Sequence, residues 1–137
     1  MQPTSQPSPN NARNIIYLDG LAGGIVGLLE LVLLDWLTQL YQLPKQLMIF
    51  ICAANLIYGA YSLNLARNIR YGTWPRRRWF ELLIFGNALW TVVCVALTTI
   101  YWSTASIFGL AHLLLEAMFV LLLAYWELRF VRPLTMS

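Results

Sequence analysis

Charged residues are scarce in this sequence. Only 11% of its 137 residues are Asp, Glu, Lys or Arg, whereas 59% are hydrophobic. A soluble domain has about 25% charged and 45–50% apolar residues, so this composition excludes a soluble fold. The apolar runs and their short connections use nearly the whole length, and we expect no separate soluble domain.

The sequence also lacks a cysteine framework and a cleavable signal. Its two cysteines, Cys52 and Cys94, lie inside apolar runs without a C-x-x-C pair, and we expect buried free thiols. The first apolar run is long and contains Glu30 and Asp35, which is unlike a signal peptide, so we expect it to be retained. The net charge is +3, but the arginines gather beside apolar runs, and we expect no nucleic-acid partner.

Four apolar stretches are long enough to cross a bilayer. They predict an all-α fold, a four-helix transmembrane bundle over residues 15–130. The predicted spans are about 15–37, 47–66, 79–100 and 105–127. Residues 1–14 are rich in Pro, Ser, Gln and Asn and predict a disordered tail, and residues 131–137 predict a short C-terminal tail.

The distribution of positive charge predicts the orientation, because Lys and Arg are retained on the cytoplasmic side. Of nine positive residues, only Lys45 lies in a connection on the other side of the predicted spans. The sequence therefore predicts a multi-pass protein of the inner (plasma) membrane. Both of its termini are predicted to lie in the cytoplasm. The same arginines could also bind anionic membrane lipid.

Each predicted span has one stripe of polar and small residues. Such stripes should face one another inside the bundle, because lipid cannot satisfy their polar groups. Counting the helical rise inward from the outer ends places most of these polar groups near one depth. The candidate ligand-binding or proton-exchanging residues are Glu30, Asn55, Tyr58, Asn87, Trp90, His112 and Glu116.

His112 and Glu116 are four residues apart and share a helix face. Either they are a structural pair, or, with Glu30 at matching depth, they exchange protons at an intramembrane site. The H-x-x-x-E spacing is not that of a zinc protease, so neither a metal site nor a cofactor is predicted. Asp19 and Glu127 are expected near the interfaces, where snorkelling or pairing with Arg explains them.

Three stretches carry a resemblance: DGLAGGIVG, IFICAANLIYGAYSLNLA and ASIFGLAHLLLEAMFV. They resemble small bacterial four-span membrane proteins of uncharacterised function, and the four-span size is similar to that of DoxX-like families. EXPERA-type sterol isomerases also place a His and a Glu one turn apart and an Asn and a Trp three apart. This resemblance implies site roles for His112 with Glu116 and for Asn87 with Trp90, although that family has five spans.

Three functions remain open at this point. The first is a polar intramembrane pocket that binds, and could transport, a small molecule or a proton. The second is a structural or accessory subunit without a ligand, and the third is a membrane enzyme acting on a lipid or isoprenoid. Expected partners are membrane lipid, a small-molecule or lipid ligand, and a second copy of the chain or another membrane protein.

Overall fold

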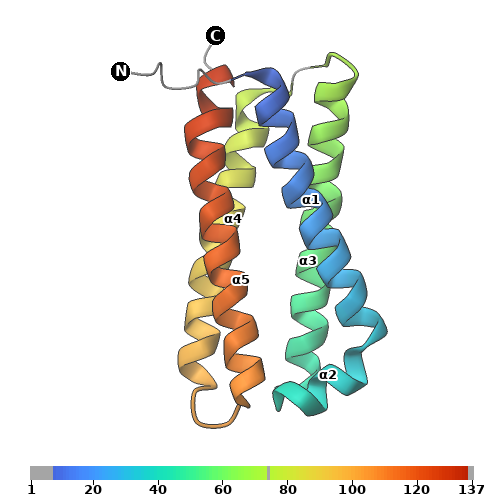
Figure 1. Ribbon diagram of the computed structural model, residues 1–137, viewed down its shortest axis with the longest axis vertical. Coiled ribbons are helices and arrows are strands. Elements are labelled where there is room, and N and C mark those ends of the chain that lie inside the picture. Colours follow the sequence, from blue (N-terminus) through green and yellow to red (C-terminus); the bar gives the residue numbers. More distant parts are fainter. Residues whose placement is uncertain (1–7, 74, 136–137) are drawn as a thin grey trace.

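Five helices make up the computed structural model, which describes residues 8–73 and 75–135. They are α1 (Pro9–Val32), α2 (Leu34–Tyr41), α3 (Lys45–Arg70), α4 (Arg77–Ile100) and α5 (Ile107–Trp126), followed by the π-helical turn η1 (Glu127–Val131) and the 3-10 turn η2 (Arg132–Thr135) (Figure 1). Four helices, α1, α3, α4 and α5 with its two turns, are long and apolar enough to cross a membrane. The predicted all-α bundle with four spans is confirmed, whereas the short helix α2 was not predicted.

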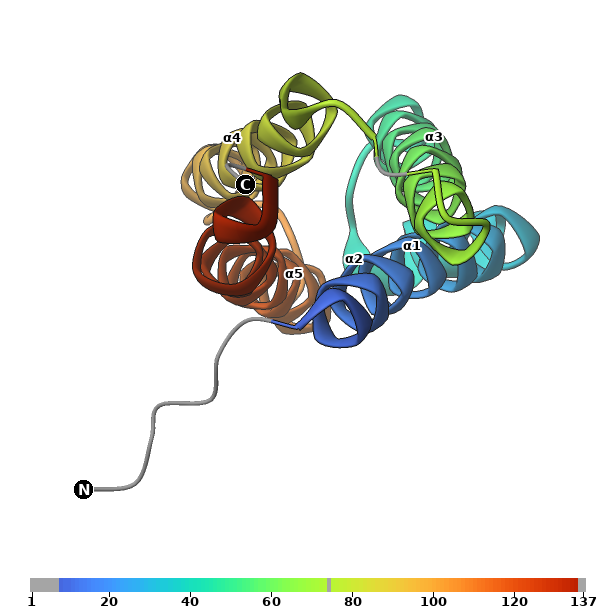
Figure 2. The ribbon, with the colours of Figure 1, turned by 90° about the horizontal axis from the view of Figure 1, so that it is seen from above.

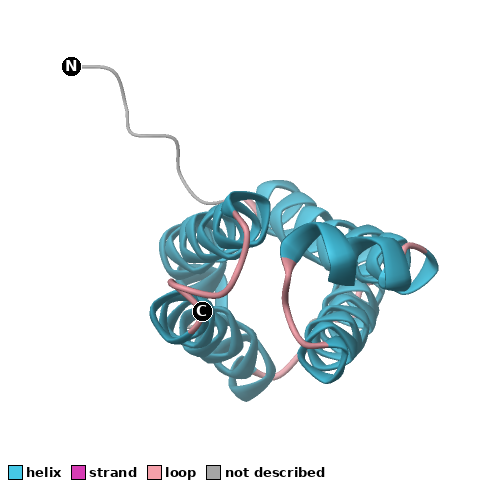
Figure 3. Cartoon of the chain, turned by 90° about the horizontal axis from the view of Figure 1, so that it is seen from below, coloured by secondary structure: helices cyan, strands magenta, loops and turns pink. Residues whose placement is uncertain are grey.

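The four long helices form two hairpins. Helix α1 packs along α3, and α4 packs along α5, while α1 and α5 are the neighbours that join the two hairpins (Figure 2). The chain enters α1 and leaves η2 at the same end of the bundle, which is the upper end in Figure 1. Helix α2 lies across the opposite end, which Figure 3 shows from below.

Helix α1 begins earlier than the sequence predicts. The hydroxyl of Ser8 accepts a hydrogen bond from the Asn11 amide at 3.2 Å, and Pro9 occupies the first turn, a common helix start. Ala12 and Ile16 are fully buried in the core of this end. Residues 9–14, predicted as part of a disordered tail, are therefore helical because a capping serine precedes them; residues 1–7 lie outside the described part.

The first predicted span, residues 15–37, is interrupted. Helix α1 ends at Val32, and after Leu33 the chain turns into α2. Helix α2 buries Leu37 against the bundle end, while Asp35 on its outer side pairs with Lys45 at 2.6 Å. The apolar run continues through this bend, so hydropathy alone could not reveal the change of direction. At the other end of the chain, residues 131–135 continue as helical turns, and residues 136–137 are not described.

Close contact between α1 and α3 depends on glycine. A Cβ on Gly59 would lie 2.5 Å from the Gly24 backbone nitrogen, and one on Gly20 would lie 2.7 Å from the backbone nitrogen of Leu63. Real Cβ atoms do not approach backbone so closely, so only glycine fits these positions. The glycine series in the first span therefore brings α1 against α3, as its small-residue spacing predicts.

The interior has apolar clusters at both ends and polar groups between them. At the end where the chain enters and leaves, the buried cluster contains Ala12, Ile16, Leu65, Ala66, Phe80, Leu83 and Val131. At the α2 end it contains Leu37, Leu43, Met48, Ile51 and Leu113. Large apolar side chains such as Ile25 and Leu28 are exposed on the outer surface, as expected of helices that face lipid. The polar groups in the middle are thus separated from both ends by apolar packing.

Candidate functional site

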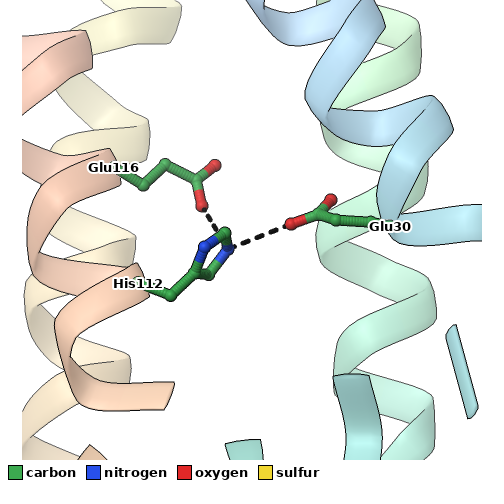
Figure 4. A group of neighbouring side chains, drawn as sticks. All are labelled: Glu30, His112 and Glu116. Atoms are coloured by element: carbon green, nitrogen blue, oxygen red, sulfur yellow. Dashed lines mark hydrogen bonds and ion pairs between the residues drawn. The ribbon is translucent and has the colours of Figure 1, made fainter. Parts of the chain in front are cut away.

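A first group of polar side chains lies toward the α2 end, and we call it the histidine layer: Glu30, Asn55, Trp90, His112 and Glu116. Figure 4 shows its centre, where Glu30 from α1 and Glu116 from α5 both point at the imidazole of His112. His112 Nε2 lies 3.0 Å from Glu30 Oε1 and 3.3 Å from Glu116 Oε2. Two carboxylate oxygens therefore converge on one nitrogen.

The second oxygen of each carboxylate has its own donor. The Asn55 amide Nδ2 on α3 donates to Glu30 Oε2 at 3.3 Å, and the Trp90 indole on α4 donates to Glu116 Oε1 at 2.7 Å. Tyr41 stacks on the His112 ring, with centroids 5.0 Å apart. The donors and the stacked ring fix the orientation of all three central side chains.

One oxygen in this layer lacks a proton donor. An imidazole nitrogen carries at most one hydrogen, so His112 Nε2 cannot donate to both carboxylates at once. Its hydrogen-bond partner is Glu30 Oε1, and among the described residues Glu116 Oε2 has no hydrogen-bond partner. The Glu116 side chain is only 10% exposed, so this oxygen is an unsatisfied acceptor inside the bundle.

A second group, the aspartate layer, lies nearer the chain ends: Asp19, Ser62, Asn87 and Glu127. The Ser62 hydroxyl donates to Asp19 Oδ2 at 2.7 Å, and the Asn87 amide donates to Glu127 Oε2 at 3.1 Å. Asp19 and Glu127 are close enough to interact electrostatically, and among the described residues Glu127 Oε1 has no hydrogen-bond partner. All four side chains are buried, so this layer is closed to solvent.

The two layers have the same construction. In each, α1 and the α5–η1 helix supply a carboxylate, and α3 and α4 supply a donor. Asp19 and Glu30 are eleven residues apart on α1, as are Glu116 and Glu127 on α5 and η1. Eleven residues are close to three helical turns, so the carboxylates of one helix share a face and lie about 16 Å apart along it.

A cavity of about 130 Å³ lies between the layers. Asn55, Trp90 and Glu116 line it at one end, and Asp19 and Asn87 line it at the other. Its remaining lining residues are mostly apolar: Ala22, Gly23, Val26, Ala54, Tyr58, Gly86, Phe119 and Val120. This volume is close to that of the apolar protein cavity of about 150 Å³ that holds benzene.

The structure brings together five of the seven predicted site residues. Glu30, Asn55, Trp90, His112 and Glu116 form the histidine layer. Asn87 lies in the aspartate layer instead, and the Tyr58 hydroxyl donates to the Leu83 carbonyl at 2.6 Å, although both residues line the cavity. Their predicted roles in binding or proton exchange stay predictions.

The aspartate layer is the part of the site that sequence reasoning missed. Asp19 and Glu127 were expected near the interfaces, but their exposures are 3% and 0%. Nearness to predicted span ends was misleading, because α1 begins at Pro9 and the last span continues through η1 and η2 beyond Glu127. The equal spacing of carboxylates on the two helices could have indicated this layer.

The same side chains define which ligands the site can hold. Glu30, His112 and Glu116 each offer one metal-ligating atom, and these atoms lie within 4.8 Å of one another. His112 and Glu116 lie on one helix, so their spacing predicts that they are close, whereas Glu30 comes from another helix and was related to them only by its matching depth.

The fold and the two layers define a class, a multi-pass helical membrane protein with a polar interior. No protein family, curated protein or solved structure matches the chain. The resemblances based on its sequence stretches therefore stay predictions.

Proposed function

We propose that the bundle binds a small organic molecule in the cavity between the two polar layers. The observation that carries this proposal is the cavity itself, which has apolar walls and polar groups at both ends. Ligand pockets commonly combine an apolar lining with a few placed polar groups. A ligand here would be about the size of a benzene ring and would carry polar groups that reach Asn55 and Asn87.

The lining predicts how such a ligand is oriented. Glu116 and Asn55 offer an acceptor and an amide at one end, and Asp19 and Asn87 do so at the other. The walls between them come from all four long helices, so a bound molecule would contact both hairpins. Passage across the membrane would then require the hairpins to part at one layer while the other stays closed.

Filling the cavity tests this proposal. Ala54 lines the cavity, whereas its neighbour Ala53 is exposed on the same helix, so Ala54→Leu and Ala53→Leu form a matched pair. Purified protein, extracted with its native lipids, would be analysed for bound compounds by mass spectrometry. We expect a compound in the wild type and in Ala53→Leu, and at least tenfold less in Ala54→Leu. Equal amounts in all three, or no bound compound in any, would contradict the proposal.

We further propose that the chain lies in the inner membrane with both termini in the cytoplasm. Support comes from the positive residues. Arg67, Arg70 and the run 76–78 are in or beside the connection between α3 and α4, at the end of the bundle where α1 begins. The connection between α4 and α5 contains no Lys or Arg. This asymmetry is the pattern of a protein whose arginine-rich side stays cytoplasmic.

A structural subunit without a ligand is the second candidate, favoured by the glycine contacts. The α1–α3 packing shows that small residues serve helix association in this chain. If the polar layers only join the hairpins, substitutions of their carboxylates would change stability while no compound co-purifies with any variant. The cavity-filling experiment therefore separates the two functions.

A further inference from the structure

We infer that Glu30, His112 and Glu116 form a binding site for a divalent transition metal ion of the Zn²⁺ class. The inference starts from the convergence of three ligand atoms. Glu30 Oε1 and Glu116 Oε2 approach the same nitrogen, His112 Nε2, at 3.0 and 3.3 Å. Hydrogen bonds from His112 Nε2 to both carboxylates would need two hydrogens, and this nitrogen has at most one.

The spacing of these atoms fits one metal ion. Ligands bound at about 2.1 Å with angles of about 90–105° lie about 3.0–3.3 Å apart, which matches the two distances from His112 Nε2. The whole set lies within 4.8 Å. Tetrahedral ligands of one such ion are about 3.4 Å apart, so the two carboxylates would need to approach each other by up to about 1.4 Å.

The surrounding residues hold the ligands as metal sites require. Each carboxylate has one oxygen bound by an outer donor, Asn55 for Glu30 and Trp90 for Glu116, which leaves the other oxygen facing His112. Hydrogen bonds of this kind orient the ligands of metal sites and are worth about 10–100-fold in affinity. The two donors therefore present the metal-facing oxygens in advance.

Charge and an unsatisfied oxygen both point to a cation. Two carboxylates with one neutral imidazole would carry two negative charges in a low-dielectric interior, which is costly. A divalent ion makes the site neutral. It also provides a ligand contact for Glu116 Oε2, which lies 3.3 Å from His112 Nε2 but has no hydrogen-bond partner among the described residues, and which belongs to a side chain that is nine-tenths buried. A mixed set of imidazole and carboxylate ligands favours Zn²⁺, Fe²⁺ or Mn²⁺ over Mg²⁺ or Ca²⁺.

Glu116 also lines the cavity, so an ion at this site would lie at one end of it. Three protein ligands leave coordination positions for water or for a polar group of a bound molecule, as in metal sites that bind substrates. The metal site is independent of the proposed organic ligand, and each can be tested without the other.

The single histidine makes a direct test possible. The chain contains one His, so tag-free protein labelled with ¹⁵N-histidine gives ring signals only from Nδ1 and Nε2 of His112. The full chain in lipid nanodiscs would be titrated with Zn²⁺ and, separately, with Cd²⁺ enriched in ¹¹³Cd. We expect saturation at one ion per chain, a changed Nε2 signal and a ¹¹³Cd–¹⁵N coupling. Binding without a change at this imidazole would mean an adventitious ion only and would overturn the inference.

Matched variants separate ligation from folding. Glu30→Gln removes a ligand on α1, whereas Asp19→Asn makes the equivalent change in the aspartate layer of the same helix. We expect Zn²⁺ affinity to fall at least 100-fold in Glu30→Gln and to stay within threefold of wild type in Asp19→Asn. The outer-donor variant Asn55→Ala keeps all three ligands and should lose about 10–100-fold. Equal affinity in all these proteins would also overturn the inference.

The outcome distinguishes this site from the proposed function. Protein that binds Zn²⁺ at His112 but carries no organic compound would contradict only the cavity proposal. Protein that carries the compound but binds no metal at His112 would contradict only the metal site.

Discussion

Glu127 is the most completely buried acidic residue among the described residues. It has no exposed surface, and it begins the π-helical turn η1. Its carboxylate accepts from Asn87 and lies beside Asp19. A side chain with this volume and these partners contributes both packing and hydrogen bonding. Its replacement can therefore separate the two contributions.

We predict that Glu127→Ala destabilises the protein and that Glu127→Gln does not. Alanine leaves the Asn87 amide without an acceptor and opens a void, and one unsatisfied buried polar group costs about 1–3 kcal/mol. Glutamine keeps the volume and a carbonyl acceptor for Asn87, and its amide can donate to Asp19. Thermal unfolding in detergent should show a loss of about 5 °C or more for alanine and less than about 2 °C for glutamine.

Glu81→Ala is the control for this comparison. Glu81 is an exposed glutamate paired with Arg77 at 2.6 Å, and exposed pairs contribute little to stability. Its removal should leave the melting temperature nearly unchanged. Equal losses in Glu127→Ala and Glu81→Ala would show that the aspartate layer does not stabilise the bundle.

The sequence predicted which side chains lie together where a helical spacing connected them. His112 and Glu116 share a face because they are four residues apart on one helix, and the structure places them together. Depth counting also placed Glu30 at their level, and Asn55 with it. The same count placed Asn87 in this group, although its partner is Glu127, because depth alone does not determine which of two neighbouring layers a side chain joins.

Among whole elements, the contact of α1 with α3 is the most demanding sterically. A Cβ on Gly59 would lie 2.5 Å from the Gly24 nitrogen and 2.9 Å from the Gly20 carbonyl oxygen. Both atoms are backbone and cannot move without displacing α1. By contrast, a Cβ on Gly24 would meet no heavy atom within 4 Å.

These two glycines are predicted to respond in opposite directions to the same substitution. Gly59→Ala should force the helices apart and cost about 1–3 kcal/mol, as overpacking does. Gly24→Ala should be neutral or stabilising by up to about 1 kcal/mol, because alanine favours the helix over glycine. Melting temperatures of the two variants in the same detergent measure the difference. A loss in Gly24→Ala as large as that in Gly59→Ala would contradict this account of the contact.

The boundaries of the membrane spans were predicted less well than their number. The apolar runs identify four spans, but a run of hydrophobic residues does not record where a helix bends. At Leu33 the chain turns although no Pro or Gly is present there, and α2 packs by its own apolar face. The start of α1 was missed for the opposite reason, because the helix begins in the polar segment that follows the Ser8 cap.

At the scale of the whole molecule, polar contacts join the two hairpins. Glu30 on α1 meets His112 on α5 in one layer, and Asp19 meets Glu127 in the other. At the α2 end, the Ser106 hydroxyl donates to the Leu40 carbonyl at 2.6 Å, which connects α2 to the start of α5. The polar layers and this contact therefore act together with the apolar clusters at both ends, which also contain residues of both hairpins.

The orientation of the whole molecule is the last prediction. Thr73 and Thr104 are exposed and lie in the connections at opposite ends of the bundle, so Thr73→Cys and Thr104→Cys are matched probes. The native thiols Cys52 and Cys94 are buried and should react little with the maleimide. Labelling of the wild-type protein under the same conditions is the control for this background reaction. If arginines retain their side in the cytoplasm, a membrane-impermeant maleimide should label Thr104→Cys in intact cells with a permeabilised outer membrane. Thr73→Cys should be labelled only after the inner membrane is disrupted. The reverse pattern would place both termini outside, and the positive charges would then need another explanation, such as binding of anionic lipid.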